Sequence, residues 1–126
     1  MPHDYEPFPL IAAGGFAGAC VRYILNEAVP GMPGILVINV LGCYLLGLLM
    51  YESIYIGAFS PRVRLACGVG FVGAFTTFST FSLQTFKASP GMALANVLVS
   101  LALGFVGIYL GRLTIAVVSR RVPWKR

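Results

Sequence analysis

The stretch "GFVGAFTTFSTFSLQTF", residues 70–86, decides how the third membrane segment of this chain folds. Gly73 and the β-branched pair Thr76 and Thr77 are poor helix formers in the middle of an otherwise apolar, uncharged run. We therefore expect the helix to unwind locally at this point. Irregular backbone at membrane depth is tolerated where protein or a cavity surrounds it, and its freed carbonyl groups suit a cation.

The composition is that of a membrane protein. Of the 126 residues 58% are hydrophobic and 10% are charged, and the mean hydropathy is +0.86. A soluble chain of this length could not bury so much apolar surface. The net charge of +5 comes from basic residues that are scattered or gathered near one terminus, which favours interfacial anchors over a nucleic-acid surface. Three isolated cysteines, at 20, 43 and 67, are expected to be reduced packing residues.

Charged residues divide the chain into uncharged stretches that suit helices of about 20 residues, the length needed to cross a bilayer. Short linkers rich in Pro and Gly favour an antiparallel up-and-down bundle. The sequence thus predicts an all-α membrane protein, a single unit over 1–126, whose third helix is broken near its middle. The expected spans are about 7–26, 33–51, 63–86 and 91–115. Glycine pairs spaced four apart, Gly14/Gly18 and Gly107/Gly111, predict close helix packing.

The distribution of Lys and Arg predicts cytoplasmic termini. Arg22 and Lys87 fall on the opposite side, and Arg22 must snorkel or line a wet cavity because it lies within the first span. The terminal side carries Arg62, Arg64, Arg120, Arg121, Lys125 and Arg126, with Arg112 close to it.

The spans contain no Asp, Glu, Lys or His, and apart from arginines their polar side chains are neutral. That absence disfavours a proton relay and the buried carboxylate of a drug antiporter, and it leaves no nucleophile–base pair for an enzyme. Hydrogen-bond donors without a nearby carboxylate suit an anion. The alternative is that these groups only bond to backbone carbonyls or facing helices. Phe78 and Phe81, three residues apart, either present positive ring edges to an anion or pack in the core.

Three motifs resemble those of the Fluc family of fluoride channels, also called CrcB. They are "GGFAGACVRY" at 14–23, "GILVINVLGCYLLG" at 34–47 and "GFVGAFTTFSTFS" at 70–82. The resemblance implies a passive, fluoride-selective channel, not an enzyme, in the inner (plasma) membrane. It also implies an antiparallel dual-topology dimer with two pores, so that the partners are fluoride, the lipid bilayer and a second copy of the chain.

The resemblance further implies which residues carry the function. A structural sodium ion would be held by the backbone carbonyls of Gly73 and Thr76. Arg22 would lie near the aqueous vestibule. The fluoride pathway would contain Asn39, Phe78, Ser79, Thr80, Phe81 and Ser100.

Three positions depart from the family pattern. Ile35 stands where a threonine is frequent, Gln84 where a glutamate is common, and Asn96 where a tyrosine precedes the fourth-helix serine. The uneven Lys/Arg distribution also fits dual insertion poorly, which leaves a heterodimer with a related subunit as an alternative to the favoured homodimer. A small four-helix cation or drug antiporter and a non-transporting scaffold are the alternative functions.

Overall fold

The protein is described by a computed structural model that covers residues 7–121, and this part is helical apart from short connections. Its four long apolar segments are α1 (Pro7–Ala28), α2 (Met32–Tyr55), a third segment (Pro61–Lys87) and α6 (Pro90–Arg121). The expected all-α membrane protein with four spans is confirmed. Two of the basic residues used for the topology prediction, Lys125 and Arg126, lie outside the described residues.

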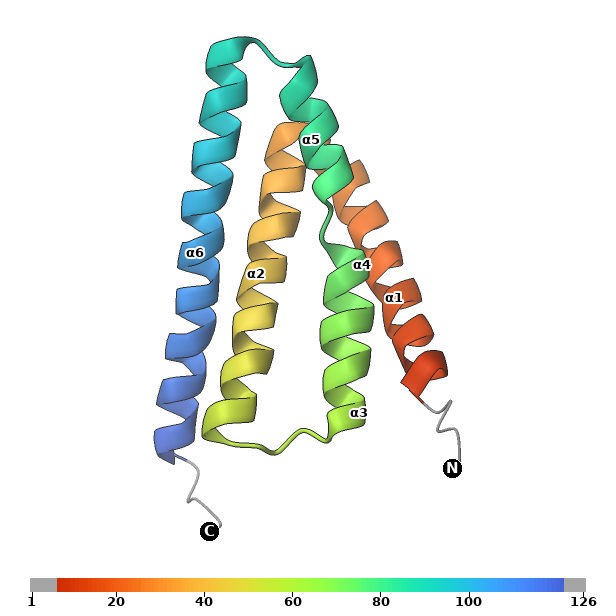
Figure 1. The fold of residues 1–126 in the computed structure, drawn as a ribbon, viewed down its shortest axis with the longest axis vertical. Coiled ribbons are helices and arrows are strands. Elements are labelled where there is room, and N and C mark those ends of the chain that lie inside the picture. Colours follow the sequence, from red (N-terminus) through yellow and green to blue (C-terminus); the bar gives the residue numbers. More distant parts are fainter. Residues whose placement is uncertain (1–6, 122–126) are drawn as a thin grey trace, which may run out of the picture.

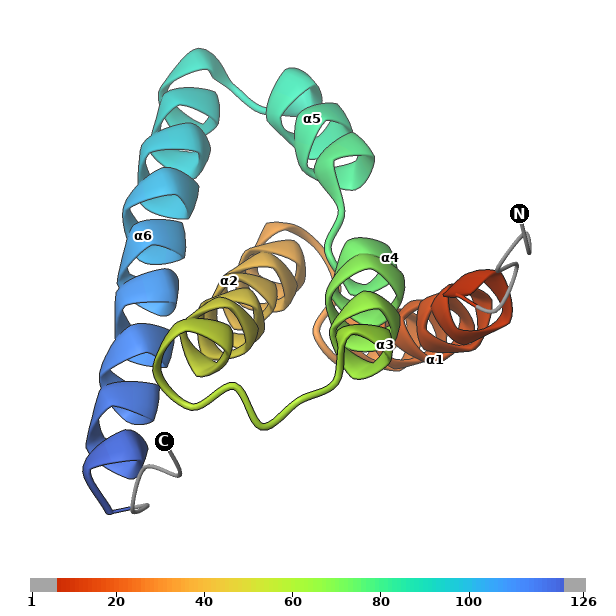
Figure 2. The same ribbon diagram turned by 60° about the horizontal axis from the view of Figure 1, so that its bottom comes forward.

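The four segments run alternately up and down (Figure 1). α6 packs along α2, and α1 packs along the first half of the third segment, as the turned view in Figure 2 also shows. Proline lies in the first turn of α2 and of α3 (Pro61–Arg64), where its missing N–H costs nothing. The first residue of α1, the last residue of α6 and the α2–α3 connection share one end of the molecule (Figure 1).

The third segment consists of four consecutive pieces. α3 continues into η1, a π-helix (Leu65–Val72), then into the short α4 (Gly73–Phe75). After an interruption at residues 76 and 77 the chain resumes as α5 (Phe78–Lys87). The predicted break is confirmed. The π-helix was not expected from the sequence; there a Cβ on Gly70 would lie 2.5 Å from the carbonyl oxygen of Ile11 in α1, so only glycine permits this approach.

The two glycine pairs place helix backbones in direct contact. A Cβ on Gly18 would collide with the carbonyl of Phe71 in the third segment. On α6, a Cβ on Gly107 or Gly111 would lie 2.9 Å or 2.6 Å from a carbonyl oxygen of α2. The close packing predicted from the four-residue spacing is therefore confirmed, with α1 against the third segment and α6 against α2.

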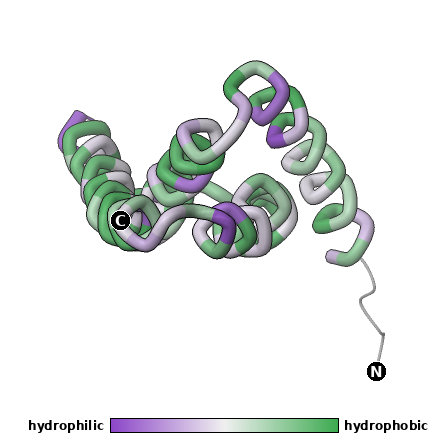
Figure 3. Tube along the Cα trace, turned by 90° about the horizontal axis from the view of Figure 1, so that it is seen from above, coloured by the Kyte–Doolittle hydropathy of each residue, from purple (hydrophilic) through white to green (hydrophobic). Residues whose placement is uncertain are grey.

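The outer surface is strongly apolar. Phe16, Phe86 and Phe105 are 75%, 88% and 72% exposed, whereas the buried core is limited to a few residues such as Ile38 and Phe75. In Figure 3 hydrophobic residues occur all around the helices and not only on the sides that face one another. Such a surface needs lipid or another subunit as its surroundings.

Candidate functional site

The break in the third segment is capped by its own threonine. Thr76 and Thr77 are extended, with ψ of 158° and 121°. Thr77 is the N-cap of α5: its Oγ1 accepts from the N–H of Thr80 at 3.3 Å and donates to Thr80 Oγ1 at 3.1 Å. The Ser79 hydroxyl lies 3.4 Å from the same oxygen. The hydroxyls that follow the break are thus gathered around Thr77, which is itself buried.

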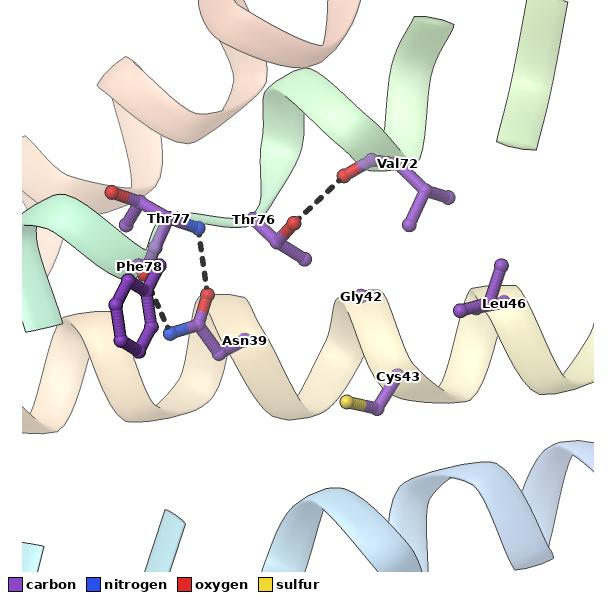
Figure 4. A pocket seen from close by; sticks show the side chains of 8 residues that line it. All are labelled: Asn39, Gly42, Cys43, Leu46, Val72, Thr76, Thr77 and Phe78. Atoms are coloured by element: carbon purple, nitrogen blue, oxygen red, sulfur yellow. Dashed lines mark hydrogen bonds between the residues drawn. The ribbon is translucent and has the colours of Figure 1, made fainter. Parts of the chain in front are cut away.

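Asn39 of α2 holds the break in place from the neighbouring helix. Its Oδ1 accepts from the N–H of Thr77 at 2.9 Å, and its Nδ2 donates to the carbonyl of Thr77 at 3.0 Å (Figure 4). One side-chain amide therefore satisfies both backbone groups of a residue that has left the helix. In the low-dielectric interior of a membrane protein an unpaired backbone group is costly, so this pair stabilises the irregular segment.

The break releases the two carbonyls that were expected to bind sodium. In an uninterrupted helix Gly73 would accept from Thr77 N–H and Thr76 would accept from Thr80 N–H. Here Thr77 N–H donates to Asn39, and Thr80 N–H donates to the Thr77 side chain. The Thr76 carbonyl instead accepts from Arg22 Nη1 at 3.3 Å. Arg22, expected near an aqueous vestibule, thus reaches the break itself.

The two helix ends at the break have opposite polarity. The carboxyl end of the third segment's first half presents carbonyl groups and carries partial negative charge, while the amino end of α5 presents N–H groups and carries partial positive charge. The guanidinium of Arg22 lies at the carbonyl end. The amino end of α5 carries Phe78 and Ser79, which suits an anion that approaches from that side.

A pocket of about 290 Å³ opens at the break (Figure 4). Its polar lining comes from Asn39, Thr76 and Thr77, and Phe78 also lines it. A second groove of about 360 Å³ shares Leu46 with this pocket and extends along α2 to Arg64 in α3. The two hollows therefore follow one side of α2 from the break towards the end of the molecule where α2 meets α3.

The two phenylalanines proposed for the pathway contact each other across one helical turn. Their ring centroids are 5.9 Å apart and the ring planes are tilted by 36°. Phe78 is 80% exposed, whereas Phe81 packs against the core formed by Ile35, Ile38 and Phe75. The alternatives of anion contact and core packing therefore apply to different rings: Phe81 belongs partly to the core, and Phe78 is left facing outward.

The structure brings most of the predicted pathway residues together at the break, with one exception. Asn39, Ser79 and Thr80 are linked through Thr77, and the two phenylalanines follow directly. Ser100 is half-buried on α6 and lies outside the pocket.

The three residues that depart from the family pattern are buried or half-buried between the helices. Asn96 of α6 donates to Thr85 Oγ1 at 2.7 Å, and Thr85 donates to the carbonyl of Phe81 at 2.8 Å, which connects α6 to the helix that bears the phenylalanines. Ile35 is buried in the core. Gln84 is half-buried, and its Oε1 is without a partner among the described residues.

Sequence reasoning assigned no role to two residues that organise the structure. Thr77 was recognised as a poor helix former but not as the cap of α5, although a threonine ahead of a new helix is a common N-cap signal. Glu52 directly follows the expected second span, 33–51, where an exposed boundary residue would be expected, yet it is 3% exposed. Its Oε1 accepts from the N–H groups of Ala58 and Phe59 at 2.6 and 2.9 Å, and its Oε2 lies 3.8 Å from Arg64 Nε, so Glu52 orders the α2–α3 connection.

Comparison with known proteins identifies relatives over nearly the whole chain. A family model described as CrcB-like protein, Camphor Resistance (CrcB), matches residues 9–112. The chain is 48% identical over 118 residues to "Fluoride-specific ion channel FluC 2" of Methanosarcina barkeri, with 94% of each chain covered. It is 46% identical over 112 residues to the FluC 2 protein of Methanosarcina acetivorans, with 89% of each covered. It is also 44% identical over 107 residues to the FluC 1 protein of Haloarcula marismortui, with 85% of this chain and 84% of that protein covered.

Proposed function

This chain belongs to the CrcB family, and we propose that it is a fluoride-specific ion channel whose conduction pathway passes the break in the third segment. It is a multi-pass membrane protein, and as a passive channel it is not an enzyme, as the sequence predicted. The observation that supports this pathway most strongly is the Asn39–Thr77 pair, which fixes an extended segment beside a pocket between apolar helices.

Fluoride must exchange its water for protein donors as it passes. The hydroxyls of Ser79 and Thr80 and the free N–H groups at the start of α5 can replace part of that hydration. The positive edges of Phe78 and Phe81 can face the anion. All of these groups are neutral, so they attract the ion without holding it in a salt bridge. Arg22 at the carbonyl end adds a positive field that favours anions near the break.

We further propose that the working channel is an antiparallel homodimer with two pores. Phe78 is 80% exposed in the single chain, and the hydroxyl-bearing Ser79 beside it is also exposed. The exposed hydroxyl of Ser79 and the polar groups of the break would be unfavourable against hydrocarbon, because lipid offers no hydrogen-bond partner. A second copy that covers this face would bury both and would close the open side of the pocket. The chain would then insert in both orientations in the inner (plasma) membrane.

The released carbonyls of Gly73 and Thr76 fit the proposed sodium ion, because both have lost their helical donors and carbonyl oxygens suit a hard cation. Arg22 shares the Thr76 oxygen, so the guanidinium and the ion would lie on the same carbonyl group. One chain supplies few ligands, and the second copy of an antiparallel dimer would complete the set. Bound there, sodium would neutralise the partial negative charge at the carboxyl end of the third segment's first half in each copy and hold the subunits together.

The test is fluoride efflux from liposomes that contain the purified protein alone. Fluoride loaded inside should leave once a potassium ionophore balances the charge, and an electrode in the outer solution records it, while chloride stays trapped under the same conditions. A well-folded protein that releases no fluoride would contradict the homodimeric channel. Drug uptake driven by a proton gradient would instead support the antiporter.

A further inference from the structure

A cluster of tyrosines and arginines lies where α2 ends beside α6. A pocket of about 380 Å³ is lined there by Tyr55, Tyr109, Arg112, Ser119 and Arg120 among others. We call these five residues the α2–α6 site. It shares no lining residue with the pocket at the break, and the proposed channel function leaves it unexplained.

Stacking holds one of the arginines in a defined position. The guanidinium carbon of Arg112 lies 5.5 Å from the centroid of the Tyr51 ring, and Tyr51 stacks in turn on Tyr55, with ring centroids 5.9 Å apart. A cation above an aromatic face is attracted by the ring and keeps the N–H groups at its edge available. A planar guanidinium with free N–H groups is well suited to two hydrogen bonds to a phosphate.

The length of α6 favours a position of the α2–α6 site at the level of the lipid headgroups. α6 has 32 residues and is about 48 Å long, which exceeds a hydrocarbon core of about 30 Å. Arg112 precedes the last residue of α6, Arg121, by about 14 Å. Tyrosine and arginine concentrate at this depth, where rings sit among the headgroups and guanidinium groups reach lipid phosphates.

The acidic residue nearest to the α2–α6 site does not neutralise the positive charge of its arginines. Glu52 lies next to Tyr51 in α2, but its carboxylate is buried and faces the other way, towards the N–H groups of Ala58 and Phe59 and towards Arg64. Arg112 and Arg120 are both exposed on α6. Two arginines in one pocket at the membrane surface therefore favour a ligand with negative charge.

We propose that the α2–α6 site binds the phosphate of an anionic phospholipid. The acyl chains of that lipid would lie along the exposed apolar surface of α6, on which Phe105 and Leu101 are 72% and 57% exposed. Arg112 binds the phosphate while stacked on Tyr51, and Arg120 contacts it from two turns further along α6. Tyr109 and Ser119 offer hydroxyls to the glycerol part of the headgroup.

The test is native mass spectrometry of the full-length protein in mild detergent, titrated with phosphatidylglycerol or phosphatidylcholine. We expect wild type to retain phosphatidylglycerol selectively. Arg112→Gln combined with Arg120→Gln should weaken that binding by about 30-fold, since each basic side chain near the surface contributes several-fold. Arg121→Gln is the matched control, because it removes the same charge from the neighbouring residue, which does not line the pocket.

Several outcomes would overturn the proposal. Equal losses from Arg120→Gln and Arg121→Gln would show diffuse attraction to surface charge and no defined site. Unchanged binding in the double variant would show that another element, such as a second copy of the chain, covers the pocket. Displacement of the lipid by millimolar inorganic phosphate would show a site for free phosphate. Arg112→Lys retains charge but loses the planar stack, and the proposal expects it to bind more weakly than wild type and more tightly than Arg112→Gln.

Discussion

Replacing Asn39 by alanine removes the clamp that holds the break. The side chain makes two hydrogen bonds to one residue, at 2.9 Å from the N–H and at 3.0 Å to the carbonyl of Thr77. Thr77 is 8% exposed, so neither backbone group can turn to bulk water without moving the segment. Alanine leaves both groups unpaired at the point where fluoride is proposed to pass.

The size of the effect follows from these contacts. A buried donor or acceptor that loses its partner costs about 1–3 kcal/mol, and hydrogen bonds between membrane helices average about 0.6 kcal/mol because other partners are found. We therefore expect that leaving both the N–H and the carbonyl of Thr77 unpaired costs about 2–4 kcal/mol of free energy in total. Each 1.36 kcal/mol is a tenfold change, so local opening of the break should become roughly 30-fold or more easier.

Two measurements report this change in Asn39→Ala. Hydrogen exchange at the amide of Thr77 should lose protection by roughly 30-fold or more, because its acceptor is gone. Fluoride efflux from liposomes should fall by at least about tenfold, since the pathway is then bounded by a segment without a fixed conformation.

Asn96→Ala is the matched control. It removes another half-buried asparagine whose amide bonds to the third segment. That hydrogen bond is made to Thr85, near the carboxyl end of α5 and away from the break. The control should leave protection at Thr77 close to that of wild type. If hydrogen-exchange protection at Thr77 and fluoride efflux in Asn39→Ala both stay within twofold of wild type, Asn39 does not stabilise the break as argued.

Three further sets of substitutions test other parts of the structure. Phe78→Ile with Phe81→Ile should abolish fluoride efflux while size-exclusion behaviour is kept; unchanged efflux would show that the rings only pack. Gly111→Ala places a Cβ 2.6 Å from a carbonyl oxygen of α2 and should destabilise the fold by about 1–3 kcal/mol, read as a lower melting temperature, whereas Gly91→Ala has open space around it and should not. Glu52→Ala leaves two N–H groups of the α2–α3 connection without an acceptor and should cost about 2 kcal/mol, and Glu52→Gln, which keeps an acceptor oxygen, should cost less; equal losses in a denaturation series would contradict the role given to that oxygen.

Much of the fold could be predicted because it follows from local properties of the chain. Uncharged stretches define the spans, and the weak helix formers Gly73, Thr76 and Thr77 mark the break. The four-residue spacing of Gly107 and Gly111 predicts that a helix approaches closely. It does not say which helix, because that depends on how the bundle closes.

The details of the site depended on contacts between distant residues and could not be predicted. Asn39 and Thr77 are 38 positions apart, and Arg22 and Thr76 are 54 apart. Nothing near Asn39 in the sequence shows that its amide completes the backbone of another helix. The π-helix also depends on a neighbour, since it brings Gly70 against the backbone of α1.

Glu52 shows a different reason for a missed residue. A carboxylate near the end of an apolar run is expected to be an exposed boundary residue. Its oxygen atoms accept hydrogen bonds only when the following connection folds back over it. Two N–H groups and the nearby Arg64 then compensate its burial. The sequence contains all of these groups, but their convergence is a property of the loop.

The most direct test of the central claim is the reversal potential of currents through the purified protein in a planar bilayer, with a known ratio of fluoride concentrations across the membrane and chloride making up the difference. A fluoride-specific passive channel should conduct measurable current, and its reversal potential should lie close to the equilibrium potential of fluoride, with chloride contributing little. A reversal potential near zero under these conditions, or current that requires a proton gradient, would contradict it.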